Sequence, residues 1–173
     1  MFMNLKKMII NSILLAIGAI LHQIAPPLLL GMKPDISLAM LFIIVILNKN
    51  YKVCLCAGIV AGLLAAATTT IPGGQYANVI DKFITVNVMF LFLKPLRDRV
   101  NNQINIALTT ALGTIVSGSI FLTIILITVG LASGFNVMFV TVVLPAAVIN
   151  TIVAVILFNI INVALKRGAI KQI

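Results

Sequence analysis

Long apolar runs, separated by short polar segments, make up almost all of the sequence. Hydrophobic residues account for 62% of the 173 positions and charged residues for only 9%, so the chain cannot cover a soluble core with polar surface. A transmembrane helix needs about 20 residues, so six of them would use about 120 and leave too few for a soluble domain. The sequence therefore predicts an all-α integral membrane protein with six transmembrane helices, in contact with membrane lipid and forming a single membrane domain, 1–173.

Prolines and charged clusters mark where the apolar runs end. Pro26 and Pro27 close the first run, because proline lacks a backbone donor and restricts the residue before it. The run of residues 36–47 is short for a crossing, so its helix is predicted to begin near Lys33. Pro145 predicts a kink in the last helix. The expected spans are residues 4–24, 33–47, 53–69, 77–93, 104–129 and 136–165.

Basic residues gather on one side of this layout. With both termini in the cytoplasm, ten Lys and Arg residues fall inside and two fall outside. The inside set is Lys6, Lys7, Lys49, Lys52, Lys94, Arg97, Arg99, Lys166, Arg167 and Lys171, and the outside set is Lys33 and Lys82. Positive charge in short loops favours the cytoplasm, so both termini are predicted to be cytoplasmic. The net charge of +9 then reflects topology, and without a basic helix face it does not indicate a nucleic-acid partner.

Two short segments on the predicted outer side hold two of the three acidic residues. Lys33 and Asp35 flank a proline, and Asp81 precedes Lys82 directly. Charges at membrane depth are costly unless they are paired, hydrated or used to bind a ligand. One interpretation is that the two segments face each other across a substrate, and the other is that they are self-neutralising surface pairs that mark helix starts. A site with both signs of charge suits a zwitterion such as a free amino acid.

Polar residues and glycines next to these charges extend the candidate site. Gly73 and Gly74 would allow a ligand close to the backbone, while Gln75, Asn78 and the threonines at 68–70 could bind a polar ring atom. Methionine, leucine and phenylalanine side chains could form an apolar pocket wall. The predicted substrate-binding residues are Met32, Lys33, Asp35, Gly74, Gln75, Asn78, Asp81 and Lys82.

Small residues form a stripe on the first predicted helix. Ser12, Ala16 and Ala19 share one face, where another helix backbone could approach closely. Both internal packing and docking on a partner protein fit this pattern. Small residues at Gly58 and Gly62 likewise predict close helix packing in the third span.

Two polar side chains are expected within the membrane. His22 lies near the end of the first span, and Asn150 lies in the last. An intramembrane histidine can relay protons or contact a ligand. No acidic residue lies within one helical turn of His22 in the sequence, which gives no support to a relay.

The sequence offers little for catalysis. It has one histidine, no acidic pair on a common helix face, no H-E-x-x-H or G-x-S-x-G motif and no metal-ligand cluster. The nucleotide-binding pattern G-x-x-x-x-G-K-[ST] is also absent. We therefore expect a protein that is not an enzyme and needs no cofactor, and active transport would require a partner that supplies the energy.

Short motifs in matching order carry a resemblance to a known family. They are Gly31-Met32-Lys33-Pro34-Asp35, Pro72-Gly73-Gly74-Gln75, Asn78, Asp81-Lys82, the stretch Ala-Ile-Gly-Ala-Ile-Leu-His at 16–22, Pro26-Pro27 and the stretch Gly-Thr-Ile-Val-Ser-Gly at 113–118. In this combination, which covers most of the chain, the sequence resembles the tryptophan transporter family TrpP.

The resemblance implies a substrate-binding S component of an energy-coupling factor (ECF) transporter in the cell membrane. Such a component captures its solute on the outer side with six helices, and a separate membrane T component with two cytoplasmic ATPases supplies the energy. S components typically dock through an Ala-x-x-x-Ala face on the first helix, and the matching positions here are Ser12 and Ala16. The family implies tryptophan or a related amino acid as substrate, whereas the residues alone indicate a zwitterion with polar and apolar parts.

Two other functions remain open. A self-sufficient ion-coupled amino-acid carrier would also place ionisable residues in the membrane, although the inverted repeats usual in such carriers are not evident in the sequence. A membrane assembly protein that does not transport would use the small-residue helices for docking alone.

Overall fold

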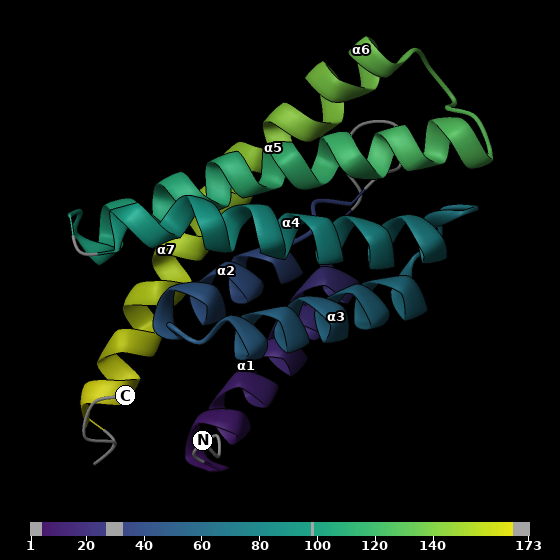
Figure 1. Ribbon diagram of the computed structural model, residues 1–173. Coiled ribbons are helices and arrows are strands. Elements are labelled where there is room, and N and C mark those ends of the chain that lie inside the picture. Colours follow the sequence, from purple (N-terminus) through teal and green to yellow (C-terminus); the bar gives the residue numbers. More distant parts are fainter. Residues whose placement is uncertain (1–4, 27–32, 98, 168–173) are drawn as a thin grey trace.

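The computed structural model describes residues 5–26, 33–97 and 99–167, and the regular structure within these ranges is entirely helical (Figure 1). The elements are α1 (Leu5–Ile24), α2 (Ser37–Leu47), α3 (Tyr51–Thr68), α4 (Gly74–Leu96), α5 (Asn102–Thr128), α6 (Phe135–Met138), the π-helix η2 (Phe139–Val143) and α7 (Leu144–Arg167). The elements α6, η2 and α7 follow one another without a break and form one long irregular helix.

Successive helices run back and forth through the bundle, so the connecting segments collect at two ends (Figure 1). The end of α1 and the segments between α3 and α4 and between α5 and α6 lie at one end, and the short connections from α2 to α3 and from α4 to α5 lie at the other. The start of α1 and the end of α7 are both at this second end. The two predicted charged segments therefore meet at the same end of the bundle.

Four of the described helical stretches are long and apolar enough to cross a membrane: α1, α3, α5 and the stretch Phe135–Leu165. Large apolar side chains such as Ile13, Ile127 and Ile156 are exposed on their outer faces, as lipid contact requires. These features establish an all-α membrane protein. The helix α2 has only 11 residues and α4 carries Asp81 and Lys82 within it, so the number of crossings and the side on which the termini lie stay predictions.

The helix α2 begins at Ser37, four residues after the predicted start near Lys33. Pro34 and Asp35 lie in the segment before the helix, where the Asp35 carboxylate accepts a hydrogen bond from the Ser37 N–H at 3.1 Å. An acidic side chain in this position satisfies a free backbone donor at the helix start and complements the helix dipole. The later start keeps the Asp35 side chain outside the helical turn, free to contact α4.

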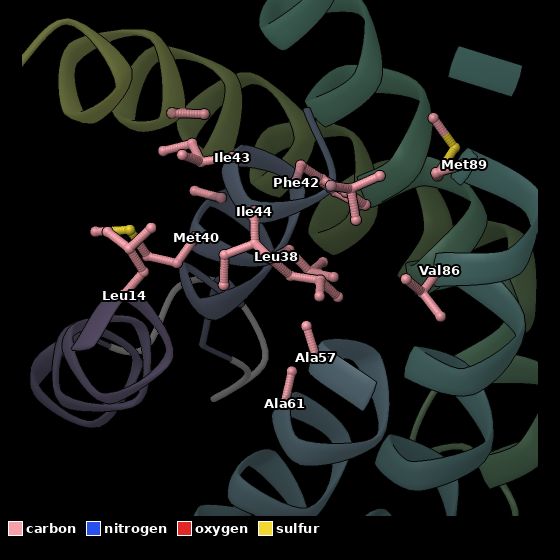
Figure 2. Packing of buried hydrophobic residues seen from close by; sticks show 14 of the residues in the cluster. Leu14, Leu38, Met40, Phe42, Ile43, Ile44, Ala57, Ala61, Val86 and Met89 are labelled. Carbon is pink, nitrogen blue, oxygen red and sulfur yellow. The ribbon is translucent and has the colours of Figure 1, made fainter. Parts of the chain in front are cut away.

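The bundle is built around α2. Nine of its 11 residues are buried, and a helix that is apolar on all sides belongs at the centre of a bundle. Figure 2 shows its side chains pointing in several directions, toward Leu14 of α1, Ala57 and Ala61 of α3, and Val86 and Met89 of α4.

Glycines allow the helices to approach this core closely. A Cβ on Gly18 of α1 would lie 3.0 Å from the Met40 Cβ, and a Cβ on Gly113 of α5 would overlap the Phe42 ring. The prediction of close packing in α3 is confirmed, because a Cβ on Gly62 would lie 3.1 Å from the α4 backbone. Large side chains thus pack into gaps that only glycine leaves open.

The π-helix interrupts the last helix directly before Pro145, where the sequence predicts a kink. Proline has no N–H, so the preceding turn cannot keep the regular α-helical hydrogen bonds. Around this irregular turn, Met138 and Val143 pack with Leu122 of α5 in a small apolar cluster of their own. The cluster positions one wall of the cavity described next.

Candidate functional site

A cavity of about 110 Å³ lies within the bundle, toward the end where the charged segments meet. Its polar lining comprises His22, Lys33, Asp35, Thr68, Thr69, Thr70, Asn78, Asp81, Lys82, Thr114 and Ser117. Its apolar lining includes Leu38 and Ile71 and a continuous set from α5, η2 and α7, which we call the apolar wall: Phe121, Leu122, Val142, Val143 and Ala146. The cavity thus combines a charged part with an apolar part.

Lys82 holds the charged part together. Its side chain is 2% exposed, and its Nζ lies 2.5 Å from Asp35 Oδ2 and 2.7 Å from Asp81 Oδ2. A buried ammonium is strongly destabilising without such partners. We call these three residues the charge cluster, and it joins α4 to the segment before α2.

Asp81 is the inner member of the charge cluster. It is fully buried, and its Oδ1 accepts a hydrogen bond from Thr85 Oγ1 at 2.9 Å. Its Oδ2 accepts from Ser117 Oγ of α5 at 2.8 Å in addition to the Lys82 contact. Three donors on one carboxylate make Asp81 a fixed structural anchor of the site.

Asp35 is the accessible member. Its side chain is 18% exposed, and its Oδ1 accepts from the backbone N–H and the hydroxyl of Ser37. His22 Nδ1 lies 3.6 Å from the same oxygen and 3.3 Å from the Pro34 carbonyl oxygen. Asp35 Oδ2 contacts Lys82, and a carboxylate oxygen has room for a second donor. Asp35 can therefore bind a cationic group that enters the cavity.

The charge cluster is not balanced. In their ionised forms, Asp35 and Asp81 carry two negative charges against the single positive charge of Lys82. Lys33 lines the cavity as well, but its Nζ donates to the Gln23 carbonyl oxygen at 2.9 Å. Within the described ranges, no three His, Cys, Asp or Glu side chains come together to hold a metal ion. The site thus favours a positively charged group near Asp35 and leaves Lys33 at its edge.

The structure places five of the predicted substrate-binding residues in the cavity lining: Lys33, Asp35, Asn78, Asp81 and Lys82. Gly74 and Gln75 do not line it. Gln75 is exposed because the inward stripe of α4 continues through positions 78, 81, 82 and 85, and Gly74 instead packs against Thr69. Met32 lies outside the described residues.

The two predicted charged segments meet in a different way from the one expected. Asp35 and Lys82 touch directly rather than across an open gap, and the segments are not the two separate surface pairs of the alternative interpretation. His22 has an acidic neighbour after all, which the sequence hides because Asp35 comes from another segment.

The predicted substrate-binding residues did not include Thr114, Ser117 and Gly118 of α5, yet all three line the cavity. A Cβ on Gly118 would lie 2.6 Å from Val143 Cγ1, so this glycine lets η2 approach α5. The signal that could have found them is the polar stripe at four-residue spacing on an otherwise apolar helix.

Two of the predicted docking residues, Ser12 and Ala16, are exposed on α1 between large apolar neighbours such as Ile13 and Ile17. Ala19 is half-buried and lines a second, much smaller cavity of about 10 Å³ between α1, α2 and α3. Ser12 and Ala16 therefore lie on a surface open to a partner or to lipid, while Ala19 serves internal packing.

The comparison with protein families decides the identity of the chain. The model of the family described as "Tryptophan transporter TrpP" matches residues 4–166. The chain belongs to the TrpP family of tryptophan transporters. As a member of the TrpP family it is a multi-pass protein of the cell membrane that serves amino-acid transport, and it is not an enzyme.

Relatives agree with this family over nearly their full length. A "Probable tryptophan transport protein" of Clostridium acetobutylicum is 56% identical over 168 residues, which are 97% of this chain and 96% of that protein. Proteins with the same description from Clostridium perfringens and Bacillus subtilis are each 42% identical, covering 96% and 98% of this chain and 97% and 98% of theirs. No solved structure matches the chain.

Proposed function

We propose that this member of the TrpP family is the substrate-capturing S component of an ECF transporter and binds tryptophan in the cavity beside the charge cluster. A separate T component and two cytoplasmic ATPases would supply the energy, because the sequence has no nucleotide-binding motif of its own. The observation that carries the proposal is the partly accessible Asp35 at a cavity that is charged in one part and apolar in the other.

The charges set how an amino acid would bind. Its ammonium group would contact Asp35 Oδ2, the more accessible carboxylate of a cluster with excess negative charge. Its carboxylate would bind the Lys33 ammonium, which can turn inward from the Gln23 carbonyl at little cost because the contact is exposed. Lys82 is already engaged by two carboxylates, so its role is to hold Asp35 in place.

The apolar wall suits the ring of the amino acid. A ligand held at Asp35 and Lys33 would direct its side chain toward Phe121, Leu122 and Val143. Burial of an aromatic side chain against such a wall contributes about 1.5–3 kcal/mol to the free energy of binding, as for one large apolar side chain. The wall therefore favours a large apolar ring over a small or charged side chain.

The exposed face of α1 supports the assignment to an S component. Ser12 and Ala16 are small, exposed residues next to exposed isoleucines, so a helix of the T component could approach the α1 backbone closely there. A self-sufficient ion-coupled carrier is the second candidate, because the net negative charge of the cluster also suits a coupling cation.

Transport assays in vesicles separate the two candidates. The chain is reconstituted alone, or together with a T component and two ATPases, and uptake of labelled tryptophan is followed. The S component predicts uptake only with the full assembly and ATP. Uptake by the chain alone, driven by a sodium or proton gradient, would support the carrier and contradict our proposal.

A further inference from the structure

The inner end of the cavity holds a polar pair that the charged part of the site does not use. Asn150 Nδ2 of α7 donates a hydrogen bond to Thr114 Oγ1 of α5 at 3.3 Å, and both side chains are buried. Thr114 lines the cavity directly. Asn150 lies one helical turn beyond Ala146, the last residue of the apolar wall, and contacts the cavity through Thr114 rather than lining it itself.

This pair has more hydrogen-bond acceptors than the protein fills. Asn150 is completely buried, and its Oδ1 accepts no hydrogen bond from any residue that the structure describes. Thr114 Oγ1 accepts one bond from Asn150 and has a second lone pair. Buried polar atoms are almost always paired, so the free lone pair of Thr114 Oγ1, which lies in the cavity lining, indicates a donor that comes from the ligand.

The ring of tryptophan supplies such a donor. The indole N–H donates one hydrogen bond and cannot accept any, so it needs an acceptor within an otherwise apolar wall. Asn78 is the amide side chain of the lining, but it lies one turn before Lys82 on α4, in the charged part of the cavity. Ser117 Oγ donates to Asp81, which places it in the charged part of the cavity as well. The threonines at 68–70 also line the cavity, but they are half-buried or exposed, whereas Thr114 is buried. Thr114 is therefore best placed to bind the ring nitrogen.

We propose that Thr114 Oγ1 accepts the indole N–H of tryptophan and that Asn150 is a positioning residue that orients this hydroxyl. The inference rests on the proposed function, since it assumes tryptophan in the cavity. It identifies the pair as the determinant that separates tryptophan from ring systems of similar size without an N–H. A ligand that lacks the donor would leave the free lone pair of Thr114 Oγ1 unpaired on binding.

The test compares L-tryptophan with 3-benzothienyl-alanine, in which sulfur replaces the ring N–H, by equilibrium binding to the purified full-length chain. Wild type is expected to bind tryptophan about 10-fold more tightly. Thr114→Val should bring the ratio of the two affinities close to one, whereas Thr114→Ser, which keeps the hydroxyl, should retain it. Asn150→Leu should lower the ratio in part.

A matched control comes from the same helix. Thr109 is also a fully buried threonine of α5, but it does not line the cavity, so Thr109→Val should leave the ratio unchanged. Equal binding of the two ligands by wild type, or an unchanged ratio in Thr114→Val, would overturn the inference. Failure of wild type to bind tryptophan at all would overturn the proposed function itself.

Discussion

Replacing Asp35 by asparagine tests the proposed binding geometry most sharply. The substitution keeps the size of the side chain and removes one negative charge, while Lys82 keeps its contact with Asp81 at 2.7 Å. The charge cluster then becomes neutral instead of carrying one excess negative charge. We therefore expect the protein to fold and the ammonium of the ligand to lose its ionic partner.

The magnitude follows from that lost contact. A hydrogen bond to a charged group contributes about 1.5–3 kcal/mol, and Asp35 is largely shielded from water, with 18% of its side chain exposed. A loss of about 2 kcal/mol corresponds to about 30-fold weaker binding of tryptophan. Isothermal titration of the purified chain in detergent measures this change.

A ligand without the ammonium group separates a direct contact from a general disturbance. Indole-3-propionate keeps the ring and the carboxylate, so it should bind wild type and Asp35→Asn with affinities that differ by less than about 3-fold. The preference for tryptophan over indole-3-propionate should fall about 30-fold in the variant. Equal losses for both ligands would refute the assignment of Asp35 to the ammonium.

Three further predictions concern stability and assembly. Lys82→Met leaves the buried Asp81 and the partly buried Asp35 without their cation and should lower the free energy of unfolding by about 3–5 kcal/mol. Lys33→Met, at an exposed contact, should change it by less than about 0.5 kcal/mol, and thermal unfolding compares the two variants. Gly113→Ala should lower the free energy of unfolding by about 1–3 kcal/mol, because the added methyl group would overlap the Phe42 ring. Adding Phe42→Leu should restore part of the melting temperature, and no recovery would contradict this packing. Ser12→Leu should abolish co-purification with a T component while tryptophan binding stays intact, and full recovery of the partner would exclude this face of α1 as the docking surface.

The charged part of the site follows from the sequence because charge is so scarce. In a chain with three acidic residues, the membrane environment forces Asp35 and Asp81 to find partners, and the positions of both next to lysines mark the site. What the sequence does not reveal is the pairing. Lys82 reaches across to Asp35 because α2 begins only at Ser37, a boundary that depends on packing and capping rather than on composition.

A different physical reason explains why the apolar wall could not be predicted from the sequence. A membrane helix is apolar on its lipid face and on its packed face, so hydrophobic periodicity does not show which side of α5 or η2 faces inward. Phe121 and Val143 therefore look like any other apolar residue in the sequence. The inward position of Thr114 and Asn150 is the exception, since polar side chains in the membrane avoid lipid and point toward the bundle interior.

The most direct test of the account is equilibrium binding of L-tryptophan to the isolated, purified chain, with no T component, ATPase, nucleotide or ion gradient present. We predict saturable binding that depends on Asp35 and exceeds the binding of small or charged amino acids. Absence of binding for tryptophan and for every other free amino acid would contradict it.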